Sequence, residues 1–123
     1  MKIITKKEAL NVAKPEGVDV TYYLFDEYEM HLNIQEPHTT QSWHHHEQIH
    51  ETLFIIEGEL LAEWRDGEEP KSQIVNAGDA IETENTPHTF SNNSDKQAKF
   101  LVIKQVLSGE NKKEVLKNDK ILD

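Results

Sequence analysis

Three potential metal ligands lie within eight residues of one another near the middle of this chain. His44, His46 and Glu51 are followed by Gly58 in the pattern His-x-His-x4-Glu-x6-Gly, and a further histidine, His88, lies downstream. Imidazoles and a carboxylate bind divalent transition metals such as Mn, Fe, Ni, Co and Zn, and octahedral geometry leaves positions open for a substrate. The sequence therefore predicts that His44, His46, Glu51 and His88 bind one divalent ion.

The spacing of these residues explains how their side chains could converge. In a β-strand, residues i and i+2 point to the same side, so His44 and His46 project together while His45 faces the other way. Residues 47–50 then reset the strand phase before Glu51. We expect His88 to reach the same centre from an adjacent strand.

The third ligand has an alternative. His50 directly precedes Glu51, and neighbours on one strand cannot both face the same ion. The alternation of side chains counted back from the turn at Gly58 favours Glu51 as the inward residue. The same alternation counted forward from His46 does not decide between Glu51 and His50. We therefore predict Glu51 as a ligand and as the catalytic proton acceptor, and we keep His50 as the alternative third ligand. The predicted non-ligands are His31, His38 and His45.

Short apolar segments with turn residues between them surround these candidates. Such a pattern, repeated roughly every ten residues, is typical of an all-β sandwich or barrel. Weak helical patterns occur only near the two ends, at residues 6–12 and 110–118, and predict surface caps or frayed tails. The predicted strands span residues 18–25, 28–36, 39–45, 52–58, 59–65, 71–75, 80–83, 88–92 and 98–107.

The composition limits the classes of function. A chain of 123 residues forms one domain, and the absence of cysteine excludes disulfides and thiol catalysis. A formal net charge of −10 argues against nucleic-acid binding, which needs clustered cations. No apolar signal segment or membrane-length stretch is present in the sequence. We therefore expect a cytoplasmic protein that acts on a small molecule, with no nucleic-acid or membrane partner.

The last predicted strand is apolar on both faces. Within residues 98–107, Phe100 and Val102 point opposite to Leu101 and Ile103. A strand of this kind needs cover on both sides, from a second sheet or from another subunit. The N-terminal strands also offer an edge that a partner could pair with. We therefore expect a homodimer.

The first ligand cluster resembles a motif of the cupin superfamily, G-x5-H-x-H-x3–4-E-x6-G. His44, His46, Glu51 and Gly58 match this motif with the four-residue spacer, and His38 stands in place of its opening glycine.

The second cupin motif, G-x5-P-x-G-x2-H-x3-N, is matched less completely. Gly78, His88 and Asn92 fit it, but Glu84 replaces the proline and Thr86 replaces the second glycine. The run from Gly78 to His88 is also one residue short. We expect these departures to alter the turn that leads into His88.

The resemblance implies a double-stranded β-helix, or jelly-roll, barrel with a metal in its mouth, commonly paired as a dimer. A variant group of small cupins carries a histidine at the position of Glu51, which keeps His50 open. The implied organisation is a single cupin domain over 1–123, with a barrel core at about 38–105, N-terminal strands within 1–36 and a C-terminal tail at 108–123.

Two classes of function fit this site. The first is a metal-dependent enzyme that chelates and activates a small oxygen-rich substrate, with dioxygenase-like chemistry favoured and isomerisation second. Only Arg65 and Lys104 are candidate interior cations on the predicted strands, so a weakly charged substrate is expected. The alternative is a non-catalytic small-ligand-binding or sensor module.

Overall fold

The computed structural model describes residues 1–106 and 112–123, which form twelve β-strands and one short helix. Residues 107–111 lie outside the described part, including the last residue of the predicted strand 98–107 and the first two of the predicted helix 110–118. The elements are β1 (Leu10–Lys14), β2 (Val18–Leu24), β3 (Tyr28–Gln35), β4 (Thr39–Thr40), β5 (His44–His46), β6 (His50–Glu57), β7 (Glu59–Asp66), β8 (Glu69–Asn76), β9 (Ala80–Glu82), β10 (His88–Asn92), β11 (Ala98–Gln105), α1 (Lys112–Asn118) and β12 (Lys120–Leu122).

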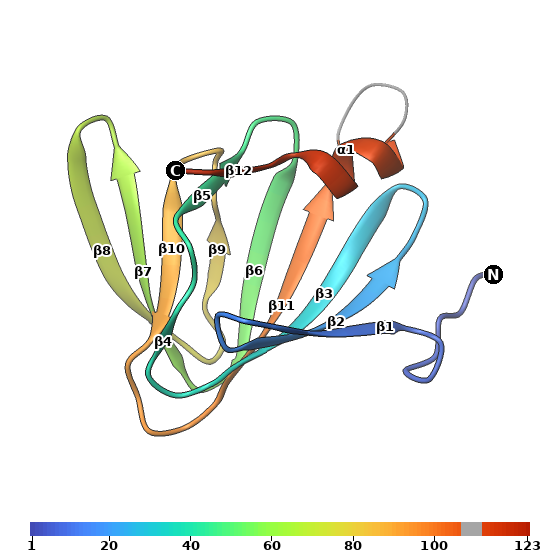
Figure 1. Cartoon of the computed structure of the whole chain (residues 1–123), viewed down its shortest axis with the longest axis horizontal. Helices are drawn as coiled ribbons and strands as arrows, with labels where there is room; N and C mark the ends of the chain where they lie inside the picture. Colours follow the sequence, from blue (N-terminus) through green and yellow to red (C-terminus); the bar gives the residue numbers. More distant parts are fainter. Residues whose placement is uncertain (107–111) are drawn as a thin grey trace.

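The described strands form two antiparallel sheets that face each other as a jelly-roll barrel (Figure 1). One sheet has the order β1-β2-β3-β11-β6-β9, and the other has the order β12-β5-β10-β7-β8, with β4 paired to β10. The sheets approach each other at the lower end of the view and diverge at the upper end. The all-β jelly-roll prediction is confirmed, and each predicted strand segment contains strand residues, with 39–45 divided into β4 and β5.

The hydrophobic core lies between the two sheets. Strand alternation places Phe100 and Val102 of β11 inward, where they pack beside Leu53 and Ile55 of β6, and Phe90 reaches the same cluster from β10. Two of the candidate ligands, Glu51 and His88, lie on β6 and β10 two residues before the core residues Leu53 and Phe90.

The predicted N-terminal helix at 6–12 is wrong. The amides of Glu8 and Ala9 donate to the carbonyl of Thr5, each at 3.0 Å, which closes one turn. Leu10 then begins β1, which pairs with β2 in a register that sets Val12 opposite Val20. Pairing with an available sheet edge outweighs a weak local preference for helix.

The C-terminal segment is helical where expected, but it is packed rather than frayed. Leu116 of α1 is buried in a small cluster with Ile49 and Val106, and α1 lies near β3 at the upper end of the barrel (Figure 1). The strand β12 pairs with β5, which sets Lys120 opposite His46. No helix within the described residues is long and apolar enough to cross a membrane.

The turn between β6 and β7 depends on a glycine. Gly58 has a φ of 82°, and an added Cβ would lie 2.8 Å from the carbonyl oxygen of Gln97. Gly67, between β7 and β8, has a similar φ of 73° but nothing within 4 Å of such a Cβ. The two glycines therefore share the backbone requirement and differ in packing.

We expect Gly58→Ala to destabilise the protein by about 1–3 kcal/mol more than Gly67→Ala. Both variants carry the cost of a left-handed backbone, but only the first forces a side chain onto a neighbouring backbone oxygen. Urea denaturation of the two variants measures the difference. Equal midpoints would show that the contact with Gln97 is relieved at little cost.

Candidate metal centre

The four predicted ligands lie on three strands at the polar end of the barrel. His44 and His46 both point inward from β5 and His45 points out, as the strand phase predicted. Glu51 is the second residue of β6, and His88 is the first residue of β10, where it pairs with His44. The exposed fractions of the four residues are 6%, 1%, 5% and 3%.

These side chains converge on one point. His44, His46 and Glu51 each offer a ligand atom within 4.8 Å of the others, so this group could hold a metal ion. The Glu51 carboxylate reaches both sides of the cluster, since its Oε2 lies 3.0 Å from His46 Nε2 and its Oε1 lies 3.4 Å from His88 Nε2. The rings of His44 and His88 are 4.6 Å apart between centroids.

Backbone carbonyls fix which nitrogen of each imidazole faces the cluster. A carbonyl can only accept a hydrogen bond, so an Nδ1 bonded to one carries a proton, and in the neutral imidazole the lone pair is then on Nε2. The Nε2 atoms of His46 and His88 are buried and have no hydrogen-bond partner, although Glu51 is near. Imidazole lone pairs that face a carboxylate in a buried site could bind a cation. The Nδ1–oxygen distances are 2.8 Å from His44 to Ser42, 3.1 Å from His46 to Asp119, and 2.7 Å from His88 to Thr86.

The surroundings of His44 and Glu51 shift their pKa values toward the protonation states that bind a metal ion. Burial lowers the pKa of His44 to about 4, so its imidazole is neutral at neutral pH. Burial would raise the pKa of Glu51, but contacts with His46 and His88 and the charge of Lys104 outweigh it and hold the pKa well below its ordinary value. A neutral imidazole and an ionised carboxylate are the forms that coordinate a metal.

The structure places His50 away from the cluster. Its side chain is exposed, and its Nδ1 lies 3.6 Å from a carboxylate oxygen of Glu82. The neighbouring Glu51 is turned inward, as expected for adjacent residues on one strand. The three histidines predicted as non-ligands bind carboxylates outside the cluster: His31 pairs with Glu29, His38 with Asp95, and His45 with Asp123.

The loop that separates His46 from Glu51 is held by residues that the sequence analysis did not identify. Asp119 is buried, and its Oδ2 accepts hydrogen bonds from three successive backbone amides, those of residues 47, 48 and 49, at 3.1, 2.7 and 2.9 Å. Asn85 donates to the carbonyls of His46 and Ile49 from the other side, at 2.7 and 3.1 Å. Asp119 and Asn85 therefore act as positioning residues.

The turn before His88 tolerates the departures from the second cupin motif. Glu84 and Asn85 both adopt positive φ, 52° and 61°, which supplies the tight reversal without a glycine. The amide of Thr86 donates to the carbonyl of Thr83 at 3.0 Å and closes the turn. His88 therefore enters the cluster in spite of the altered sequence.

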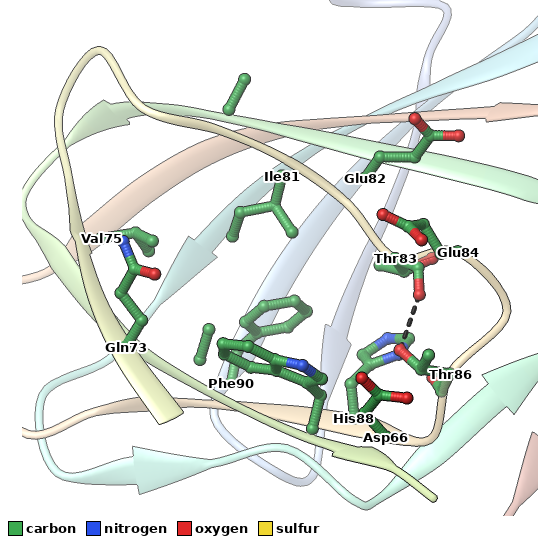
Figure 2. A pocket seen from close by; sticks show the side chains of 13 residues that line it. Asp66, Gln73, Val75, Ile81, Glu82, Thr83, Glu84, Thr86, His88 and Phe90 are labelled. Atoms are coloured by element: carbon green, nitrogen blue, oxygen red, sulfur yellow. Dashed lines mark hydrogen bonds between the residues drawn. The ribbon is translucent and has the colours of Figure 1, made fainter. Parts of the chain in front are cut away.

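A cavity of about 410 Å³ adjoins the cluster at His88, which is one of the residues that line it (Figure 2). His88 lies at one end with the acidic side chains of Asp66, Glu82 and Glu84, whereas Phe90 lies in its apolar part. We call this the acidic cavity, since the described residues that line it include no lysine or arginine.

Comparisons with known proteins agree with this fold. A protein-family model described as a cupin domain matches residues 31–104. Among curated proteins, none matches this chain significantly. Several solved structures share the fold at about one-fifth identity.

Three of these structures illustrate how widely the fold is used. Drosophila melanogaster CENP-C bound to CAL1 has a TM-score of 0.75 and 20% identity, covering 84% of this chain and 81% of that one. An oxalate oxidase has a TM-score of 0.69 and 21% identity, covering 85% of this chain and 59% of that one. A sugar phosphate isomerase from Silicibacter pomeroyi has a TM-score of 0.64 and 20% identity, covering 78% and 68%. At these identities the likeness shows the fold.

We expect Asp119→Ala to lower the free energy of unfolding by roughly 2–4 kcal/mol, because three backbone amides lose a charged acceptor. It should also weaken metal binding, since the loop between His46 and Glu51 loses its anchor. Asp123→Ala is the matched control, as it removes a carboxylate that pairs with His45 on the outer side. Chemical denaturation and metal titration of both variants check this, and equal effects would contradict a positioning role for Asp119.

Proposed function

This chain belongs to the cupin family, and we propose that it is an enzyme in which one divalent transition metal activates a small oxygen-rich substrate. The proposed ligands are His44, His46, Glu51 and His88. The observation that carries the proposal is the pair of buried Nε2 atoms, on His46 and His88, that face the Glu51 carboxylate without a hydrogen-bond partner. Mn, Fe, Ni, Co and Zn all suit this donor set.

The side chains of the site have different proposed roles. Three neutral imidazoles and one carboxylate would leave one positive charge on a bound divalent ion. Such an ion, when bound, polarises substrate oxygens as a Lewis acid. Glu51 is also the proposed proton acceptor. Lys104 Nζ lies 3.6 Å from Glu51 Oε2, so its charge stabilises the carboxylate form.

We favour oxygen-dependent, dioxygenase-like chemistry and place isomerisation second. Nitrogen and oxygen ligands with open coordination positions are typical of non-haem iron and manganese oxygen chemistry. The oxalate oxidase and the sugar phosphate isomerase share the fold at about one-fifth identity, and both reaction classes therefore enter the test. A small molecule in the cytoplasm is the proposed substrate, since a net charge of −10 disfavours nucleic acid.

The alternative function is a non-catalytic ligand-binding or sensor module. The likeness to CENP-C bound to CAL1 favours it, because the same fold there occurs in a complex with another protein. A metal that binds without turnover would point to this alternative.

We further propose that the chain forms a homodimer through the outer face of its first sheet. Phe54 of β6 is 47% exposed, and the register sets it beside Leu101 of β11, which in turn lies beside Leu32 of β3. Ile103 and Met30 form a second apolar pair on the same face. This continuous apolar surface suits a two-fold contact with a second copy.

We expect His88→Ala and Glu51→Gln each to weaken metal binding by more than about a hundredfold, because each removes a ligand. His45→Ala and His50→Ala should retain the metal, since both side chains point away from the cluster. Elemental analysis of each variant after dialysis measures occupancy.

Oxygen uptake by the iron- and manganese-loaded protein with diketones and hydroxy acids, together with a sugar isomerisation assay, tests catalysis. An empty site in His50→Ala with a full one in Glu51→Gln would show that His50 is the third ligand. Full occupancy without turnover in any assay would favour the binding module.

The homodimer should give a mass near 28 kDa by light scattering, twice the 14.2 kDa of the chain. Phe54→Glu should reduce the mass to that of a monomer, because a charge cannot be buried in an apolar contact without a partner. Ile74→Glu is the control, since Ile74 is 57% exposed on β8 of the other sheet. A wild-type mass near 14 kDa at micromolar concentration would refute the proposed dimer.

A further inference from the structure

We propose that the substrate is a small hydroxy-carboxylate anion whose carboxylate is bound by Lys14, Lys104 and Lys120 beside the metal ligands. This inference rests on the proposed metal-dependent function and names the substrate class of that site. It differs from the weakly charged substrate expected from sequence, because Lys14 and Lys120, from the N-terminal and C-terminal segments, line the cavity beside the ligands.

The first observation is an inner cavity of about 40 Å³ that connects the lysines to the ligands. It is lined by the candidate ligands His44 and Glu51 and by Lys14, Lys104 and Lys120. A space of this size holds only a few atoms, which fits the carboxylate end of a small acid. The lysines come from β1, β11 and β12, so three strands distant in the sequence build one cationic surface.

The second observation is a larger cavity of about 490 Å³, which we call the lysine cavity. It shares Lys14, Lys104 and Lys120 with the inner cavity, and Lys117 and His46 also line it. Its volume is that of a pocket for a small ligand. The lysine cavity therefore offers an anion a route toward the ligand cluster.

The charge of this region is opposite to that of the chain as a whole. The lysine cavity is lined by four lysines and by one carboxylate, that of Glu29, among the described residues. Glu29 is already engaged, since its Oε1 lies 2.8 Å from His31 Nε2. A local positive field inside a protein of net charge −10 would guide an anion to this cavity and disfavour it elsewhere.

The other carboxylate beside the three lysines is also engaged. Glu16 lines the inner cavity, and its Oε2 accepts from the amide and the hydroxyl of Ser42 at 2.9 and 3.1 Å. Burial lowers the pKa of Lys120, and the charges of Lys14 and Lys104 add to this although Glu16 and Glu51 oppose it. The lysines therefore repel one another, and a bound anion would relieve that repulsion.

The acidic cavity on the other side of the cluster suits an anion poorly. Asp66, Glu82 and Glu84 line it, and its described lining includes no lysine or arginine. Arg65, one of the two interior cations expected from sequence, is exposed and lies 4.7 Å from the Trp43 ring centroid. Charge therefore assigns the substrate to the lysine side.

A hydroxyl on the substrate has a partner in the inner cavity. Asn33 lines this cavity, and its amide oxygen is buried with no hydrogen-bond partner. A substrate hydroxyl can donate to that oxygen and satisfy it. The lysines and Asn33 together select an anion that carries both a carboxylate and a hydroxyl.

The test compares glycolate with glycolamide, which has the same size but no charge, as ligands of cobalt-loaded protein. The visible spectrum of cobalt reports binding near the metal, and elemental analysis reports metal content separately. We expect glycolate to bind more tightly than glycolamide. Lys14→Met and Lys120→Met should each weaken glycolate by roughly ten- to a hundredfold, the effect of losing one charge-assisted hydrogen bond, and weaken glycolamide, which lacks the negative charge, much less.

The matched control is Lys96→Met, which removes an exposed lysine from the turn before β11 and should leave glycolate binding unchanged. Lys120→Arg, which keeps the charge, should retain most of the affinity. Equal affinity for the two ligands, or no loss in the Lys14 and Lys120 variants that retain cobalt, would overturn the anion assignment and leave the metal site standing. Failure of wild-type protein to retain cobalt would refute the proposed function. In that case, glycolate titration of the metal-free wild-type protein and lysine variants would test separately whether the lysines bind the anion.

Discussion

The hydrogen bonds from three imidazole Nδ1 atoms to backbone carbonyls are the interaction on which the site depends. The Nδ1–H groups of His44, His46 and His88 donate hydrogen bonds to the carbonyls of Ser42, Asp119 and Thr86, respectively. Each Nε2 lone pair is thereby turned toward Glu51, and burial prevents water from satisfying those of His46 and His88. An arrangement of this kind is costly in the absence of a cation and favourable in its presence. The polar end of the barrel therefore carries a group of side chains that could hold a metal ion.

Two strands, β6 and β10, carry both core residues and candidate ligands. Residues such as Leu53 and Phe90 fill the space between the sheets, and Glu51 and His88 project from the same two strands two residues earlier. The period of two that buries the core therefore also aims the ligands. Precise placement needs more than this period, because His46 and Glu51 are separated by a loop. Asp119 supplies that precision from the far end of the chain by binding three amides of the loop.

The distribution of charge gives the barrel two unlike openings around one cluster. The acidic cavity lies on the side of β10, and the lysine cavity lies on the side of β1, β11 and β12. The cluster with a bound divalent ion would itself be positive. An anion on the lysine side would therefore be attracted both by the lysines and by the metal-loaded cluster. The negative net charge of the chain gives no sign of these clustered lysines, because a net charge sums all residues without regard to their positions.

The sequence by itself determined the strand segments between residues 18 and 105, the inward direction of His44 and His46, and the likeness to cupins, since these follow from local periodicity and from short motif spacing. It left Glu51 and His50 as alternatives, because the loop between His46 and Glu51 breaks the strand phase. The tertiary structure turned Glu51 inward and His50 outward. It also replaced the expected helix at 6–12 by β1, packed the C-terminal segment against β5, and brought Lys14 and Lys120 to the cluster. These outcomes depend on pairing between distant strands, and no local pattern encodes which edge a terminal segment will find.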